Sequence, residues 1–417
     1  MNIAIIHSRL NGKGGTQRQT LETAQALKRR GQNVHIYTFG SNREKGFVDL
    51  FNGLGFTALP DYQAKSQRRA IKGLGALNFF VFNARENRAA RALARLIDPA
   101  TDVIQACDQL AFRVAAFHKK LVRDVPSVIM MDDILTRSWK LWRRKEIDQD
   151  FNVPLRQRAL YAFADWRDVR RFIKPHDSIV VMDERTRSWV KKYFSKDAQI
   201  VRSGLDAGRF PYRARGPINR DRIAILAGGV FFTHRRYEDI IRAVSLLKSS
   251  GFPDTRLTIF GDYTAPSYRP YYEALVRLAD TLGVRDMVSF LGKVSEDDLL
   301  SLYHTHDIYV SANHLQSWGL AVFEAMSSGL PVIVSKSAGA AEVLTDRVNA
   351  LLVEPCSSEE IARCIRELVS SPGLSGVLSE GGRAFVRDNI TWDKTAHRLE
   401  KIFEEMIDLG QGNTGLM

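Results

Sequence analysis

The chain has 417 residues, which is longer than one ordinary α/β core and suits two. Hydrophobic residues make up 45% of it, with 29 Gly and 13 Pro, so the composition excludes disordered and fibrous proteins. The net charge of +13 is uneven: residues 1–202 hold 37 Lys and Arg against 20 Asp and Glu, or +17, and the remainder carries −4. The basic half is therefore expected to meet an anionic partner, either lipid headgroups, a phosphorylated acceptor or nucleic acid.

The first half of the chain alternates short apolar runs with amphipathic stretches. Residues 2–7 read as a buried strand, and the start of the chain lacks the charged and long apolar regions of a signal peptide. No run of about 18 apolar residues follows, so we expect a cytoplasmic protein that is at most peripheral on the inner face of the plasma membrane. A helix is predicted over residues 16–31, ending at Gly31. Further strands are predicted over residues 33–39, 102–107, 126–131 and 177–182.

Two less regular segments, residues 61–95 and 137–172, combine Arg and Lys with aromatic residues. The aromatic residues of interest are Phe79, Phe80, Phe82, Trp139, Trp142 and Trp166. Solvated helix faces are one interpretation of this pattern. A membrane surface is the other, because the cations would meet anionic lipids while the rings enter the interface.

The second half repeats the alternation of strands and helices. Strands are predicted over residues 222–229, 256–261, 287–292, 307–312 and 331–335. Helices are predicted over residues 237–251, 296–306 and 357–373, the last with a Ser-to-Glu cap and a Pro-Gly stop. Residues 203–221 lose this periodicity, collect Gly and Pro, and are expected to link two domains. The β-α-β-α pattern indicates an α/β protein with parallel sheets.

Chemistry at cysteine or at a metal is not indicated by the sequence. The three cysteines, Cys107, Cys356 and Cys364, are odd in number and fit neither a disulfide framework nor a zinc site. No acidic metal-binding cluster is evident in the pattern of Asp and Glu. We therefore expect no metal and no other cofactor.

A glycine-rich segment follows the first predicted strand. Gly14 and Gly15 let the backbone approach a ligand closely, and the N-terminus of the following helix attracts anionic groups. The segment departs from the dinucleotide pattern G-x-G-x-x-G at Gln17, and it lacks the G-K-[ST] of a P-loop. A phosphate contact and a tight strand-to-helix turn are both compatible with it.

The most specific motif is QSWGLAVFEAMSSGLPVI, residues 316–333, between a predicted strand and a helix that ends at Gly329. It resembles the signature of glycosyltransferase family 4, whose members are retaining GT-B enzymes that use nucleotide sugars. The resemblance implies that Glu324, the second acid of the signature, accepts hydrogen bonds from the donor ribose. Gln316 stands where the family has its first acid, and it carries no negative charge. The donor diphosphate would lie at the start of the helix, beside Ser317, Trp318, Gly319 and Leu320.

Other segments match the same family in the expected order. The resemblance implies that the opening pair of glycines faces the phosphate and sugar of the donor. Residues 227–243 resemble the segment that carries basic residues for the diphosphate. Gly229 stands at the earlier of its two positions, and Arg235 and Arg236 fill the later one, where Arg can replace Lys. Val294 falls where the nucleobase of the donor commonly meets the backbone.

Residues for catalysis and for the acceptor are less clearly marked. The family often has His after the strand predicted here over residues 126–131, where this chain has Asp132 and Asp133. Either carboxylate could orient the transferred sugar, or form a helix cap or turn. With Gln316, they are the catalytic candidates. The acceptor candidates are Arg18, His7 and Asp183, while His234 and His314 lie at other predicted loop positions. A partly buried structural role is the alternative for each histidine.

The resemblance implies a GT-B fold, in which two Rossmann-like domains face each other across a cleft. The expected domains are residues 1–205 for the acceptor, 206–390 for the nucleotide sugar, and 391–417 as a helix that returns to the first domain. The implied function is a retaining hexosyltransferase that moves a sugar from a nucleotide sugar to a saccharide or lipid-linked acceptor in cell-envelope polysaccharide or glycolipid synthesis. A GT-B sugar-nucleotide epimerase and a catalytically silent glycosyltransferase subunit are the alternatives. No nucleic-acid-binding module is recognised, so no nucleic acid is expected as a partner.

Overall fold

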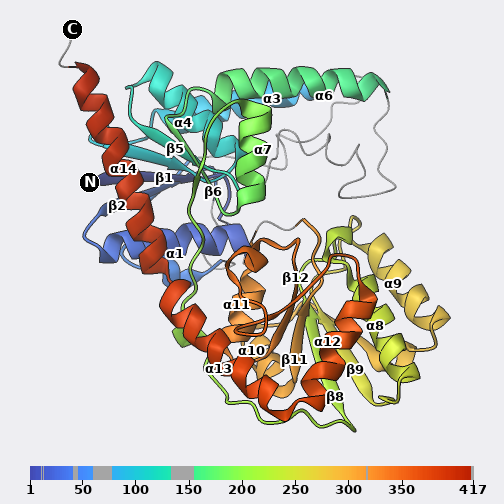
Figure 1. Cartoon of the computed structure of the whole chain (residues 1–417). Helices are drawn as coiled ribbons and strands as arrows, with labels where there is room; N and C mark the ends of the chain where they lie inside the picture. The colour runs from blue at the N-terminus through green and yellow to red at the C-terminus, as the bar shows by residue number, and fades with distance from the viewer. Residues whose placement is uncertain are drawn as a thin grey trace. The chain divides into compact units, whose positions relative to one another are not determined.

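The computed structural model describes residues 1–10, 12, 14–40, 46–59, 78–132, 155–315 and 318–414 (Figure 1). The chain forms two compact units. Within the described residues, the first unit comprises residues up to 132, residues 155–204 and residues 392–414. The described residues of the second unit lie between Leu205 and Thr391. Each unit is built on its own parallel sheet, which confirms the predicted α/β class with two Rossmann-like domains.

The sheet of the first unit has seven strands in the order β3-β2-β1-β4-β5-β6-β7. Their bounds are β1 Asn2–His7, β2 Asn33–Thr38, β3 Gly55–Ala58, β4 Val103–Ala106, β5 Ser127–Met130, β6 Ser178–Val181 and β7 Gln199–Ile200. Every neighbouring pair is parallel, and Ile3 of β1 lies opposite both Val34 of β2 and Val103 of β4. The strand order reverses between β1 and β4, and ligands of such sheets bind outside the carboxyl ends of the strands at this point.

Helices cover both faces of this sheet. Their bounds are α1 Gly15–Arg29, α3 Asn78–Ala94, α4 Gln109–Leu121, α6 Leu155–Asp168, α7 Glu184–Phe194 and α14 Trp392–Thr414. On one face, α1 and α14 share an apolar core with alternate residues of β1, such as Ile3 and Ile5. On the other face, α3, α4 and α7 pack around Ile6 and its neighbours. The helix α14 comes from the end of the chain. Arg30 forms ion pairs with two of its acids, with 2.5 Å between its Nε and Oε2 of Glu400 and 2.8 Å between its Nη1 and Oδ1 of Asp393.

The sheet of the second unit has six strands in the order β10-β9-β8-β11-β12-β13, again all parallel. The strand bounds are β8 Ile223–Gly228, β9 Thr255–Phe260, β10 Val288–Gly292, β11 Ile308–Ser311, β12 Val332–Ser335 and β13 Leu351–Val353. The helix bounds are α8 Tyr237–Ser249, α9 Arg269–Thr281, α10 Glu296–Thr305, α11 Leu320–Ser327, α12 Ser358–Ser370 and α13 Pro372–Asn389. The order reverses between β8 and β11, so a ligand is expected beyond the carboxyl ends of these two strands.

Candidate functional site

Three glycines follow or end neighbouring strands at the carboxyl edge of the second sheet. Gly229, Gly261 and Gly292 have φ of 131°, 143° and 73°, which favour glycine. A Cβ atom on Gly261 would lie 1.9 Å from the carbonyl oxygen of Gly229, so only glycine permits this approach of the two backbones. The edge is therefore formed by closely packed main chain where β8, β9 and β10 end.

Arg235 lies directly over this glycine edge, in the short 3₁₀ helix Thr233–Arg235. A Cβ atom on Gly229 would come within 2.9 Å of the guanidinium carbon of Arg235, so the guanidinium occupies the space of a missing side chain. Its Nε is buried and has no hydrogen-bond partner among the described residues. Within that part of the chain, no carboxylate pairs with the guanidinium either. A half-buried cation without a partner suits an anionic ligand.

Arg236 has a different environment, although it is adjacent in sequence. Its Nε lies 2.9 Å from a carboxylate oxygen of Asp239, and its Nη1 lies 2.7 Å from one of Glu238. These contacts tie Arg236 to the first turn of α8, which it precedes in a left-handed conformation with φ of 53°. Of the two arginines predicted to bind a diphosphate, Arg236 is committed to internal ion pairs and Arg235 is not.

Two histidines connect the ends of β8 and β11. The backbone N–H of His314, after β11, donates to the carbonyl oxygen of His234 at 2.7 Å. The ring of His234 stacks on that of Phe232 at 5.3 Å between centroids. Burial, together with the nearby charges of Arg235 and His314, lowers the pKa of His234 to about 3. His234 is thus neutral near pH 7, and its carbonyl oxygen joins the loop after β8 to the loop after β11.

The helix α11 begins beside this point. Gly319 is its N-cap residue with φ of 97°, and no described side chain caps the helix, so its first N–H groups can donate to an anionic ligand. Leu320 is its first residue and is partly buried. Trp318 is only 2% exposed and packs on Phe323 at 4.7 Å between rings. The indole of Trp318 therefore belongs to the core, and its backbone is the part near the helix start. Gln316 and Ser317 lie outside the described residues.

Glu324 lies in the second turn of α11 and is 7% exposed. The hydroxyl of Tyr303, from α10, donates to its Oε2 at 2.9 Å. Tyr303 is itself fully buried between the rings of Phe210 and Tyr309, at 6.1 and 6.2 Å between centroids. A rigid phenol thus fixes the orientation of the carboxylate that the family resemblance assigns to the ribose.

Val294 lies at the opposite side of the same edge, just after β10. It is partly buried, and the next residue, Ser295, caps α10 by accepting from the N–H of Asp298 at 3.1 Å. The strand order places three strand spacings between β10 and β11, which corresponds to about 14 Å along the edge. An extended ligand between Val294 and the start of α11 would pass Arg235 over Gly229.

The first unit has its own set of polar groups at its reversal point. The Nδ1 atom of His7, at the end of β1, accepts from the N–H of Arg9 at 3.1 Å, so its Nε2 carries the proton. This Nε2 is buried without a partner among the described residues. Burial lowers the pKa of His7, and Asp108, at 3.6 Å, opposes that effect. Asp108 also accepts from the N–H of Ser8 at 2.6 Å and caps α4.

The glycine pair and Arg18 lie at the start of α1, immediately beyond β1. Gly14 is the N-cap residue with an extended backbone, and it brings no capping side chain. Gly15 is the first helical residue, with open space where a Cβ would be. The guanidinium of Arg18 lies over the ring of Phe47 at 5.0 Å. The helix start thus offers backbone N–H groups to an anion, as the sequence predicts for it.

The acidic candidates of the first unit have separate positions. Asp183 is fully buried and caps α7, because its Oδ1 accepts from the N–H of Thr186 at 2.6 Å, so helix capping uses one of its two carboxylate oxygens. Asp132 follows β5, partly buried, and lies near enough to Cys107 to influence it. Burial raises the pKa of the Cys107 thiol far above its usual range, and Asp132 adds to this effect, so the thiol stays protonated. Asp133 lies outside the described residues.

No group of three or more His, Cys, Asp or Glu side chains that could hold a metal occurs in the described parts of the chain. In the same parts, no helix is both long and apolar enough to cross a membrane.

Two family models match this chain in adjacent segments. The model of glycosyl transferases group 1 matches residues 209–385, which contain the site of the second unit. The model of Glycosyltransferase Family 4 matches residues 13–209. Both models describe glycosyltransferases, and each covers less than half of the chain. The two matches together extend from the helix start of the first unit to α13.

Curated relatives match this chain only over part of their length. The D-inositol 3-phosphate glycosyltransferase of Salinispora arenicola is 32% identical over 133 residues, which are 32% of this chain and 30% of that protein. The chain's match spans 30%, 60% and 57% of the first three relatives, and the last of these is a glycogen synthase of Mycobacterium tuberculosis.

Solved structures match almost the whole chain. Sucrose-phosphate synthase from Thermosynechococcus elongatus is similar with a TM-score of 0.72 at 16% identity, covering 98% of this chain and 99% of that one. Anabaena Alr3699/HepE, in complex with UDP and glucose, is similar with a TM-score of 0.68 at 16% identity, covering 96% and 99%. At these identities the likeness establishes the fold alone.

Proposed function

We propose that the chain transfers a hexose, with retention, from a nucleotide sugar held by the second unit to a saccharide or lipid-linked acceptor. The proposal rests on two observations: the guanidinium of Arg235 over Gly229 has no partner among the described residues, and no described side chain caps the start of α11. Both features suit the diphosphate of a donor. The complexes of Anabaena Alr3699/HepE with UDP and with UDP-glucose support a nucleotide-sugar donor by analogy.

In this proposal each described group has one role. Arg235 and the first N–H groups of α11 neutralise the charge that develops on the diphosphate as it leaves. Glu324, oriented by Tyr303, accepts from the ribose hydroxyls, and the backbone at Val294 meets the nucleobase. The reaction is then driven by positioning and by charge stabilisation, and it requires no metal or other cofactor.

The acceptor side is proposed to lie on the first unit, at the end of β1. There the Nε2–H of His7 can donate to an acceptor hydroxyl or to a phosphate. The concentration of positive charge over residues 1–202 supports an anionic acceptor. We therefore propose a role at the cytoplasmic face of the membrane, in cell-envelope polysaccharide or glycolipid synthesis.

Thermal stabilisation by nucleotide sugars tests the donor site. A ligand that binds the native state raises its melting temperature, so one of the UDP-, GDP-, ADP- and TDP-sugars should do so. The shift should be reduced in Glu324→Gln, which keeps the shape of the side chain and removes its charge. Val377→Gln, an exposed position on α13, is the matched control and should keep the full shift. Absence of any shift in the wild type would contradict the donor site.

A sugar-nucleotide epimerase is the second candidate, and a single observation favours it. Gln316, at the position of the family's first acid, has no charge with which to support a developing oxocarbenium ion. Incubation of the bound nucleotide sugar without an acceptor distinguishes the two. An epimerised nucleotide sugar identifies the epimerase, and an unchanged one together with transfer to added acceptor identifies the transferase. Binding without either reaction would indicate a catalytically silent subunit.

A further inference from the structure

An apolar stripe runs along the solvent side of α6. The exposed fractions of Leu155, Phe163 and Trp166 are 76%, 46% and 57%, and Ala159 and Ala162 are exposed between them. At 100° per residue, these five positions fall within an arc of about 100°. The rings of Phe163 and Trp166 lie 6.1 Å apart and nearly parallel, with 30° between their planes. A helix of a globular protein ordinarily turns such a stripe toward the core.

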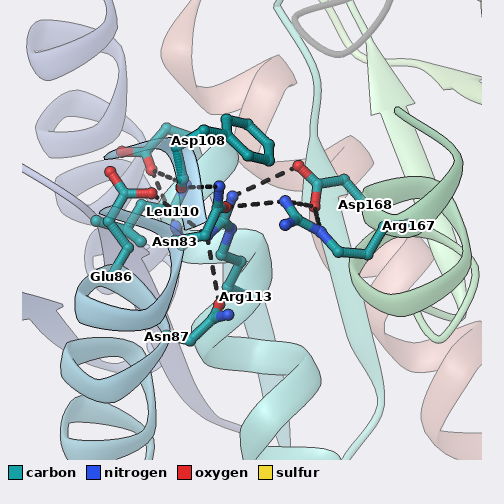
Figure 2. A network of polar contacts seen from close by, with 10 residues as sticks. Asn83, Glu86, Asn87, Asp108, Leu110, Arg113, Arg167 and Asp168 are labelled. Atoms are coloured by element: carbon teal, nitrogen blue, oxygen red, sulfur yellow. Dashed lines mark hydrogen bonds and ion pairs between the residues drawn. The ribbon is translucent and has the colours of Figure 1, made fainter. Parts of the chain in front are cut away.

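The rotation of α6 that exposes this stripe is fixed by polar contacts on its other side. Its two acids, Asp165 and Asp168, are 5% and 9% exposed. Asp168 accepts from the buried Arg113 of α4 at 3.4 Å, and Arg167 donates to Asn83 of α3 at 2.8 Å. Figure 2 shows this network between the three helices. A rotation of α6 that buried the apolar stripe would break these contacts and expose the partners of Arg113. The polar contacts therefore keep the stripe on the outside.

The charges near the stripe are positive. The π-helical turn Val169–Ile173 continues α6, and Arg170, Arg171 and Lys174 are exposed along it and just beyond. Arg170 and Lys174 have no ion-pair partner within the described part of the chain. From residue 155 to 174, the acids are buried and every exposed charge whose side chain is described is a cation. The surface is thus an apolar stripe with a cationic end.

We propose that this α6 surface, Leu155 to Lys174, docks on an anionic lipid bilayer. Trp166 and Phe163 would enter the interface between headgroups and acyl chains, while Arg170 and Lys174 meet anionic headgroups. Charge complementarity selects this occupant, because Arg170 and Lys174 are exposed cations and the headgroups that they would meet are anions. The proposal rests on the proposed function, because docking on a bilayer would bring the chain to a lipid-linked acceptor.

Flotation of the full chain with phosphatidylcholine vesicles, with and without phosphatidylglycerol, tests the docking. The wild type should float with the anionic vesicles. Phe163→Gln with Trp166→Gln, and separately Arg170→Gln with Lys174→Gln, should each lower the bound fraction by at least about tenfold. Val377→Gln, which removes an apolar side chain that is 54% exposed on α13, should float like the wild type. As these positions are exposed, the melting temperatures should stay unchanged.

Two results would overturn the docking proposal. One is a wild type that stays with the soluble fraction at moderate salt. The other is a variant with Phe163→Gln and Trp166→Gln that floats as well as the wild type, or whose only change is from a dimer to a monomer in the absence of vesicles. Lipids with a bromine-labelled acyl chain give a second measurement, because bromine quenches nearby tryptophan. The emission of Trp166, obtained as the difference between the wild type and Trp166→Phe, should be quenched on these vesicles. The nucleotide-sugar shift, measured on the same variants, separates failure of docking from failure of the donor site.

Discussion

Replacing Arg235 with alanine is expected to separate ligand binding from stability in the second unit. The guanidinium lies over Gly229 with a buried Nε that has no partner in the described residues. Hydrogen bonds from a charged donor contribute roughly 1.5–3 kcal/mol net, and a diphosphate would supply the missing acceptors. The loss of one such contact weakens binding of the nucleotide sugar by about 10- to 150-fold.

The same substitution should not lower the stability of the ligand-free protein. Arg235 has no carboxylate partner among the described residues, and its charge is one of the causes that lower the pKa of His234. Arg235→Ala therefore removes a partly desolvated cation and should leave the melting temperature unchanged or slightly raised. Arg236→Ala is the matched control. It leaves Asp239, which is 4% exposed, without its partner, so it should lower the melting temperature and keep the nucleotide affinity.

Isothermal titration calorimetry with the stabilising nucleotide, alongside thermal melts without ligand, measures both quantities. Gly229→Ala should reproduce the weak binding of Arg235→Ala, because its Cβ atom would come within 2.9 Å of the guanidinium carbon. The reasoning is refuted if Arg235→Ala binds the nucleotide as the wild type does. It is equally refuted if Arg236→Ala loses the nucleotide while Arg235→Ala loses stability.

Three further predictions concern the same two units. Burial lowers the pKa of His176 to about 4 from its ordinary 6.5, so the free energy of unfolding should fall by up to about 3 kcal/mol as the pH drops from 6.5 to 4. Urea titrations across this pH range should show the loss, and His397→Gln on α14 should not change it. Tyr303→Phe removes the hydroxyl that orients Glu324, and we expect KM for the nucleotide sugar to rise several-fold with kcat nearly unchanged in steady-state assays. Arg30→Ala leaves Glu400, 6% exposed, without its cation, and should lower the free energy of unfolding by about 1–3 kcal/mol in urea melts.

The strands and the longer amphipathic helices could be predicted from the sequence because their apolar runs match the period of the element. Residues 2–7 and 33–39 correspond to β1 and β2, and residues 237–251 correspond to α8 with nearly the same bounds. The strand β3 was not predicted, since Gly55–Ala58 is short and every residue in it is only partly buried. Short edge strands of this kind depend on pairing with a neighbour, here β2, more than on their own residues.

The helix α13 shows how tertiary packing overrides local propensity. Pro372 and Gly373 read as a stop for the preceding helix, and α12 does end at Ser370. The same proline then opens α13, because proline is tolerated in the first helical turn. Gly381 within α13 disfavours a helix, yet a Cβ there would lie 2.3 Å from the carbonyl oxygen of Val348. A close approach that no local pattern reveals therefore decides this segment.

The candidate site could be located from its motifs, but the roles within it required the fold. Nothing in the sequence distinguishes Arg235 from Arg236, since both follow the same strand. The fold separates them, because Glu238 and Asp239 lie one helical turn away from Arg236 while Arg235 turns back over Gly229. The Tyr303 contact to Glu324 was also missed, because it joins residues from two helices and leaves no local signal.

The position of α14 has a consequence for the order in which the chain can fold. The first unit contains the earliest residues of the chain, but its core includes Trp392, Leu399 and Phe403 from α14. Among the described residues, the second unit lies between Leu205 and Thr391, and all of its core residues are synthesised before α14. On the ribosome, the unit that is made second can therefore finish first, while the first unit waits with an open face over α1 until residues 392–414 emerge. That exposed face is where a holding chaperone would bind the nascent chain.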